Sequence, residues 1–210
     1  MDIQYYGANC VRLETKNAVV VVDDNLAALG LKSITKSGDI ALATSGIVAL
    51  LKVDTKITIA TPGEYEVSGV SIQGIAARAH MDEEGALTAT MFKIVTDDLR
   101  VAVVGHIYPE LNDKQLEALG TVDVLLIPVG GNGYTLDSIG ALKLIKKIEP
   151  KVVVPTHYAE KSVNYEVPQQ PLEEAIKGLA MEPKETVAKL KAKSGDLGDV
   201  SQLIVLENQS

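Results

Sequence analysis

Short runs of β-branched residues, separated by turns, restrict the fold of this sequence more than any other feature. Segments such as AVVVVD at 18–23 and VDVLLIPV at 122–129 hold mainly valine, isoleucine and leucine. These residues fit the pleated surface of a strand, and short apolar runs between turn residues predict strands. We expect strands near Ile3–Tyr6, Cys10–Glu14, Ala18–Asp23, Ile40–Thr44, Ile57–Ala60, Glu64–Val67, Val70–Ile75, Leu87–Val95, Arg100–Val104, Val122–Val129, Lys151–Pro155 and Gln202–Leu206.

Helical patterns are concentrated in the second half of the chain. The segment from Asp137 to Ile148 is followed by Pro150, and its apolar residues recur at helical spacing. This pattern predicts a helix with one apolar face, made of Ile139, Leu142, Ile145 and Ile148. The other expected helices, of which the first is the weakest, span Leu26–Ile34, Asp113–Leu119, Pro171–Leu179 and Glu185–Lys191.

Early strands and late helices indicate an α/β fold of the sandwich type, in which two sheets pack on each other with helices outside. The length of 210 residues fits one domain, so we expect a single domain over residues 1–210. Val124–Ile127 and Val152–Val154 should be buried strands, because both are continuous apolar runs.

Composition excludes several classes of function. Hydrophobic residues make up 46% of the chain and no apolar run approaches the length of a membrane span, so no membrane partner is expected. The first residues show no signal-peptide pattern. A single cysteine, Cys10, excludes an internal disulfide and favours a cytoplasmic location, with the thiol an inert packing group. The net charge of −8 argues against a nucleic-acid partner.

Polar residues that could carry chemistry follow the predicted strands. Loops after the carboxyl ends of strands are where α/β folds collect functional side chains. Solvated turns or helix caps are the structural alternative for the aspartates, and a tight connection is the alternative for the glycine-rich turn at 130–134. The candidate pocket residues are Asp23, Asp24, Thr44, Ser45, Gly131, Asn132 and Tyr134.

The chain has only three histidines, His80, His106 and His157, and all lie at or just beyond strand ends. Three imidazoles that meet at one edge would form a three-histidine site with one open position, the pattern of a catalytic zinc. The alternative is that each histidine forms local hydrogen bonds. Their spacing is not a compact motif such as HExxH, so the residues alone leave both interpretations open.

Several segments, spread over nearly the whole chain, resemble one protein family. The segments are Ile3–Cys10 (IQYYGANC), Thr61–Gly74 (TPGEYEVSGVSIQG), Glu110–Leu119 (ELNDKQLEAL), Val122–Gly131 (VDVLLIPVGG), Tyr134–Asp137 (YTLD) and Pro150–Tyr158 (PKVVVPTHY). They resemble metallo-β-lactamase-fold hydrolases, and within them the branch of ascorbate-6-phosphate lactonase-like proteins. The resemblance implies an αββα sandwich with two metal ions at one edge of the two sheets.

The sequence departs from the family at the metal ligands. The family carries a Thr-His-x-His-x-Asp-His loop after the strand that here reads DIALAT, and Ser45, Ile47, Ala49 and Leu50 stand at the four ligand positions. The resemblance places His157 at the last family histidine, His80 at the middle one, and His106 at the bridging aspartate. Ordinary two-metal catalysis needs cations about 3.5–4 Å apart that share a bridging ligand, so it is not expected here.

Two hypotheses follow from the resemblance. In the first, the metal site is lost or reduced, no cofactor is bound, and the protein binds a small molecule or has a structural role. In the second, His80, His106 and His157 hold one zinc-like divalent cation and hydrolyse a small phosphorylated or lactone-like substrate. We favour the first, because the apolar run at 47–51 is typical of a packed segment. A homo-oligomer whose site is completed by a neighbouring chain is a further possibility.

The first hypothesis makes two structural predictions. Ile47, Leu50 and Leu51 should be buried, so histidines placed at Ile47 and Leu50 should destabilise the protein rather than restore hydrolysis. The three native histidines should lie near one another without converging on one point at metal-ligand distances, which are about 2.0–2.1 Å for zinc and nitrogen.

Overall fold

Two β-sheets and three α-helices form the framework of the computed structural model, which describes residues 1–45, 53–96 and 99–210. Within these residues the first sheet has six strands in the order β13-β1-β2-β3-β4-β5. They span Leu190–Lys191, Asp2–Tyr5, Val11–Glu14, Val19–Val22, Ile40–Leu42 and Ile57–Ile59. Ile47, Leu50 and Leu51, which are predicted to be buried, lie outside the described residues. Asp97 and Asp98, which predict a turn between two strands, also lie outside them.

The second sheet has eight strands among the described residues, in the order β12-β14-β11-β10-β9-β8-β7-β6. They span Pro183–Val187, Gln202–Leu206, Val152–Thr156, Val124–Pro128, Leu99–Val103, Ala89–Thr96, Val70–Ala77 and Gly63–Val67. The central strands β10 and β11 are parallel and every residue of both is buried, which confirms the prediction for the two apolar runs.

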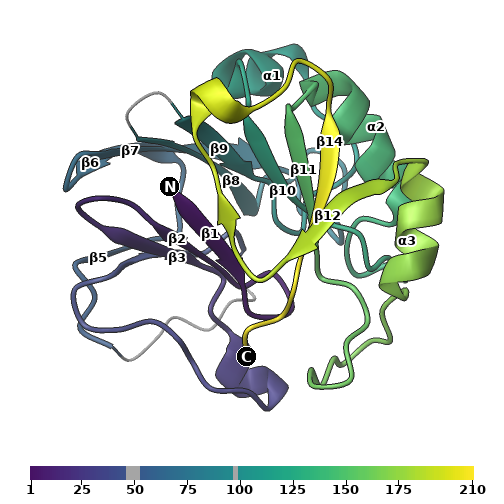
Figure 1. Cartoon of the computed structure of the whole chain (residues 1–210), viewed down its shortest axis with the longest axis horizontal. Helices are drawn as coiled ribbons and strands as arrows, with labels where there is room; N and C mark the ends of the chain where they lie inside the picture. The colour runs from purple at the N-terminus through teal and green to yellow at the C-terminus, as the bar shows by residue number, and fades with distance from the viewer. Residues whose placement is uncertain (46–52, 97–98) are drawn as a thin grey trace.

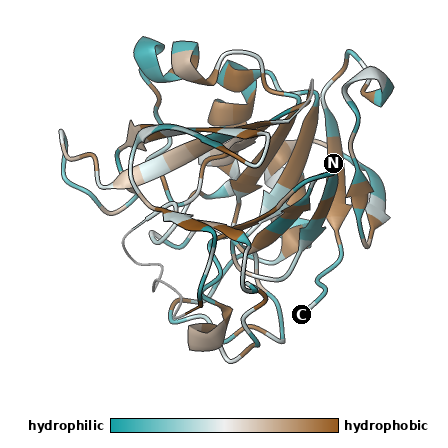
Figure 2. Ribbon diagram, turned by 90° about the vertical axis from the view of Figure 1, so that its left-hand side faces the viewer, coloured by the Kyte–Doolittle hydropathy of each residue, from teal (hydrophilic) through white to brown (hydrophobic). Residues whose placement is uncertain are grey.

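The two sheets face each other, and the helices α1 (Asp113–Leu119), α2 (Ser138–Ile148) and α3 (Leu172–Leu179) lie outside the larger sheet (Figure 1). Hydrophobic colouring is concentrated on the strands of the sandwich (Figure 2). Strand β3 shows how the layers arise. Val20 and Val22 enter the main core, whereas Val21 packs with Cys10 and Leu26 on the other face. The sandwich architecture predicted from the sequence is confirmed.

The predicted apolar face of α2 is buried in part. Ile145 and Ile148 are buried, whereas 63% of the Ile139 surface is exposed. Ser138, Ala141 and Leu144 are buried as well. The buried face therefore starts at Ser138 and includes the small Ala141, which a pattern of large apolar residues does not indicate.

Two predicted helices are wrong or shorter than expected. Of the predicted helix Leu26–Ile34, the part Leu26–Leu29 is helical. It forms the 3₁₀-helix η1, which ends at Gly30 with φ +84°. The segment Glu185–Lys191 contains no helix. It belongs to β12, which pairs with β14, and to β13, which pairs with β1, so one short stretch supplies an edge strand to both sheets. Tertiary pairing here overrides the helix propensity of glutamate and lysine.

None of the helices in the described ranges is both long and apolar enough to cross a membrane.

Candidate functional site

The ends of three parallel strands bring His106, Tyr134 and His157 together. Because β9, β10 and β11 run parallel, the loops after their carboxyl ends meet at one edge of the sheet. The ring centroids of His106 and His157 are 4.5 Å apart in an edge-to-face contact, and those of His106 and Tyr134 are 5.1 Å apart. Both histidines are more than nine-tenths buried. Two of the three sequence candidates for a metal ligand are therefore in direct ring contact.

His80 reaches the same edge from the loop after β7. Its backbone N–H donates to the carbonyl of His106 at 2.8 Å, and Ala79 forms a bridge with Ile107. The Nδ1 atoms of His80 and His106 are buried and accept or donate no hydrogen bond among the described residues. The hydroxyl of Ser45 is buried and unpartnered in the same sense. Buried polar atoms usually have a hydrogen-bond partner, so the unpartnered atoms of His80, His106 and Ser45 are an unusual feature of this edge of the sheet.

The main chain at His157 adopts a left-handed conformation, with φ +53°. Its N–H donates to the carbonyl of Ala8 at 2.7 Å, which joins the end of β11 to the loop before β2. Its Nδ1 lies 3.2 Å from Oε1 of Gln169, which accepts the imidazole proton when Nδ1 carries it. A side chain at Gly130 would collide with the His157 carbonyl, so this glycine allows the close approach. The main chain of His157 is thus held by Ala8, and its imidazole is held by Gln169.

A buried polar network joins the two sheets beneath these rings. Asp23, at the end of β3, accepts hydrogen bonds from the Thr44 N–H at 2.7 Å and the Thr44 hydroxyl at 2.6 Å. Asn9 donates to Asp23 at 3.4 Å and accepts from the Thr156 hydroxyl at 2.7 Å. The network therefore fixes the residues just before Ser45 relative to the residue just before His157.

Burial sets the charge of the groups around the site. It lowers the pKa of His106 well below its ordinary value, with a smaller contribution from the neighbouring His157 and His80. It also lowers the pKa of His157 to about 4. Burial raises the pKa of Asp23 to about 6, although its hydrogen bonds with Thr44 and Asn9 oppose that shift. Near neutral pH both histidines are uncharged, so the site carries no positive charge from them.

Several candidate pocket residues make local contacts instead of facing the histidines. Asp24 accepts hydrogen bonds from the hydroxyl of Ser33, from two backbone N–H groups and from the hydroxyl of Thr35, so it organises the loop at 33–35. The side chain of Asn132 donates to the carbonyl of Pro168, and the N–H of Gly131 donates to the carbonyl of Leu136. Of this sequence-predicted set, Tyr134 is the residue that lines the cavity beside His157.

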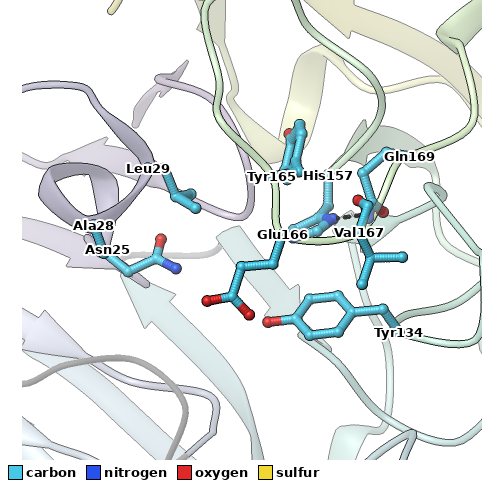
Figure 3. A pocket seen from close by; sticks show the side chains of 9 residues that line it. All are labelled: Asn25, Ala28, Leu29, Tyr134, His157, Tyr165, Glu166, Val167 and Gln169. Carbon is cyan, nitrogen blue, oxygen red and sulfur yellow. Dashed lines mark hydrogen bonds between the residues drawn. The ribbon is translucent and has the colours of Figure 1, made fainter.

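That cavity has a volume of about 100 Å³ (Figure 3). It lies between η1 and the loop that follows β11. Sequence reasoning did not single out Gln169, Tyr165 or Glu166, which all come from the stretch 159–170 that reads as a loop. The sequence feature that could have indicated these residues is that their polar loop follows His157 at the end of a strand. The lining residues are Asn25, Ala28, Leu29, Tyr134, His157, Tyr165, Glu166, Val167 and Gln169.

The described residues do not fit a two-metal centre. In the parts of the chain that the structure describes, no group of three or more His, Cys, Asp or Glu side chains could hold a metal ion. The carboxylate at the end of β3, Asp23, has both oxygens engaged by Thr44. His106 stands where a bridging carboxylate is implied, and an imidazole cannot supply two oxygens to two cations.

Comparison with known proteins gives a family match. A family model described as a beta-lactamase superfamily domain matches residues 2–157. A UPF0173 protein of Pyrococcus abyssi is 25% identical over 181 residues, which cover 75% of this chain and 83% of that protein. A UPF0173 metal-dependent hydrolase of Thermoplasma acidophilum is 30% identical over 105 residues, which cover 49% of this chain and 46% of that hydrolase.

Solved structures show the same fold. A metallo-beta-lactamase superfamily protein from Thermotoga maritima has a TM-score of 0.74 at 23% identity, with 98% of each chain covered. A metallo hydrolase from Ignicoccus hospitalis has a TM-score of 0.64 at 17% identity, with 99% of this chain and 95% of that one covered. At these identities the likeness establishes architecture and leaves the chemistry to the residues of the site.

Proposed function

This chain belongs to the beta-lactamase superfamily, and from that premise we propose that it is a small-molecule-binding member whose two-metal site has been lost or reduced. The proposal places it beside the ascorbate-6-phosphate lactonase-like branch, on the run from VDVLLIPVGG to PKVVVPTHY. It also places the protein in the cytoplasm, in keeping with a single, buried cysteine, Cys10.

The observation that carries the proposal is the contact between His106 and His157. The two uncharged rings pack edge to face with centroids 4.5 Å apart, at the position where the family resemblance implies a bridging carboxylate. In such a contact the rings pack against each other, and neither supplies an oxygen that two cations could share. Ser45 adds a hydroxyl where the resemblance implies a histidine.

What these residues do without a metal is shape and polarise a small cavity. Gln169 holds the His157 ring through Nδ1, and the Asp23 network holds the strand ends on both sides. The resulting wall is preorganised, which lowers the entropy that a ligand must lose on binding.

One observation favours a second candidate, a hydrolase that uses a single divalent cation. To hold that cation, His80, His106 and His157 would have to come closer together than they lie in this structure. Two of these imidazoles have a buried Nδ1 without a partner in the described residues. Neutral imidazoles are the form that binds zinc, and the pKa of His106 and His157 is lowered by burial. A small phosphorylated or lactone-like substrate would suit that chemistry.

Metal content distinguishes the two candidates. The protein is purified without a histidine tag and without chelators, and the metal per chain is measured by mass spectrometry. Our proposal predicts a content near zero for the wild type and for His157→Ala alike. About one equivalent in the wild type, lost in His157→Ala, would establish the single-metal candidate. Two equivalents together with hydrolytic activity would contradict both.

A further inference from the structure

The cavity beside His157 has aromatic walls. The ring centroids of His157 and Tyr165 are 5.0 Å apart, and those of His157 and Tyr134 are 5.8 Å apart. All three rings line the cavity, and Leu29 and Ala28 of η1 lie across from them (Figure 3). A group placed in this cavity is therefore close to the faces or edges of three rings.

The charge of the cavity is negative. Among the described residues that line it, Glu166 is the ionisable acid, and neither lysine nor arginine is present. The Glu166 carboxylate and the Tyr134 hydroxyl point toward the same part of the cavity (Figure 3). Burial raises the pKa of the Tyr134 phenol, and the charges of Glu166 and the buried Asp23 add to that shift. An anionic ligand would meet repulsion here.

The size of the cavity limits what it can take. A volume of about 100 Å³ is less than the roughly 150 Å³ of an engineered cavity that holds benzene. The cavity therefore fits a head group of a few heavy atoms and not a whole drug-sized ligand, whose pockets are usually about 300–1,000 Å³. Aromatic walls are the arrangement that binds ammonium groups in proteins, and a carboxylate in the lining adds an attraction for a cation.

We propose that this cavity binds the ammonium head group of a small organic cation between the rings of Tyr134, His157 and Tyr165, with the Glu166 carboxylate as the charged group of its lining. The inference rests on the proposed binding function and names its ligand class. It excludes a phosphorylated head group from this cavity. The rings attract the cation through their quadrupoles, and Glu166 adds a charge contact that salt will screen.

Tetramethylammonium chloride is the probe, titrated at constant ionic strength and followed by calorimetry and by shifts in the amide NMR spectrum. Saturable binding with shifts around Tyr134, His157 and Glu166 is expected. tert-Butanol, a similarly shaped but uncharged compound, should bind at least about fivefold more weakly, and inorganic phosphate should produce no shifts at the cavity.

Three variants and one control locate the site. Tyr134→Leu should weaken tetramethylammonium binding by about fivefold to thirtyfold, whereas Tyr134→Phe, which keeps the ring, should stay within about twofold. Glu166→Gln should weaken it by about twofold to fivefold and reduce its salt dependence. Glu173→Gln, an exposed acid on α3, should leave it unchanged. Circular dichroism verifies that each variant folds.

The proposal is overturned if tetramethylammonium does not bind, if it binds equally to wild type and Tyr134→Leu, or if tert-butanol or phosphate binds better at the cavity. None of these results changes the metal content of the protein. A wild type that holds no metal and binds tert-butanol better than the cation would leave the proposed binding function intact and remove only the ligand class.

Discussion

The two strand ends that border the site differ in what they keep from the family. At the end of β11, the segment Pro150–Tyr158 carries His157 at the expected ligand position, oriented by Gln169. At the end of β4 (Ile40–Leu42), Thr44 keeps its place in the sequence, but Ser45 follows where a histidine is implied. Yet both ends are joined to the same buried network through Asp23 and Asn9. The positions that hold the backbone are thus separable from the positions that would hold a metal.

The hydrogen bonds at this rim are concentrated on Thr44 and not on the next residue, Ser45. Thr44 gives two hydrogen bonds to Asp23, whereas the neighbouring Ser45 hydroxyl gives none among the described residues. A side chain at Gly105 would collide with Thr44, so the loop before His106 also depends on this network. If the comparison is correct, changes in the network should cost much more stability than changes at Ser45, where the family resemblance implies a ligand.

The largest effect is expected for Asp23→Ala. The variant leaves the Thr44 N–H and hydroxyl and the Asn9 amide without their buried acceptor, so the free energy of unfolding should fall by about 2–4 kcal/mol. Urea unfolding followed by circular dichroism measures it. Asp199→Ala, at an exposed position, is the control and should stay within about 0.5 kcal/mol. Equal losses in the two variants would remove the network from the explanation.

A fall in pH should change the stability contributed by His157 and the stability contributed by Asp23 in opposite directions. Burial holds the pKa of His157 at about 4, below its ordinary 6.5, so its contribution to stability is lost as pH falls from 6.5 to 4. Burial raises the pKa of Asp23 from 3.8 to about 6, so its contribution is lost as pH rises through that window.

Removing one of these two groups should reveal the pH dependence of stability that the other contributes. Asp23→Asn should lose stability more steeply than the wild type between pH 6.5 and 4.5, and His157→Gln should lose it less steeply. The difference between these two variants should be about 1–3 kcal/mol across the window, measured by urea unfolding at each pH. Parallel curves for wild type and both variants would show that neither group has a shifted pKa.

A smaller loss is expected for Gln169→Leu. This variant removes the partner of the His157 Nδ1 and leaves a buried ring nitrogen unpaired, so the free energy of unfolding should fall by about 1–2 kcal/mol. The hydrogen bond also raises the pKa of His157, so an NMR titration should place that pKa lower still. Gln170→Leu, at the adjacent and less buried position, is the matched control. An unchanged His157 titration would mean that Gln169 does not orient the ring.

The smallest effect is expected for Ser45→Ala. Its hydroxyl is buried without a partner among the described residues, so its removal should change stability by less than about 0.5 kcal/mol or increase it slightly. Thr44→Val, one residue earlier, removes a 2.6 Å hydrogen bond to Asp23 and should cost about 1–2 kcal/mol. Thermal unfolding of both variants tests the contrast, and a larger loss in Ser45→Ala would reverse it.

The sequence predicts the central strands well because β10 and β11 are buried on both faces and read as continuous apolar runs. It predicts β12 and β13 poorly for the opposite reason. Lys184, Glu185 and Thr186 are exposed in the structure, and their strand conformation comes from pairing with a segment elsewhere in the chain. Local propensity contains no information about that partner.

The same distinction applies to the site. That His106 and His157 follow parallel strands can be read from the sequence, and parallel strands bring their carboxyl ends to one edge. The roles of Asn9 and Gln169 cannot be read in this way. Each comes from a loop whose path depends on left-handed backbone at particular residues, such as φ +49° at Ala8 and φ +53° at His157. Such conformations are rare outside glycine, so no sequence pattern indicates them.

The strands made by residues 183–191 join parts of the chain that lie far apart in sequence. Asp2 of β1 pairs with Lys191 of β13, so one edge of β1 stays without its partner until a segment almost 190 residues later has been made. Until then, one edge of β1 has unpaired backbone groups, which are a template for pairing with other chains. Contacts this distant in sequence slow folding, and here they postpone completion of the smaller sheet until β13 has been synthesised.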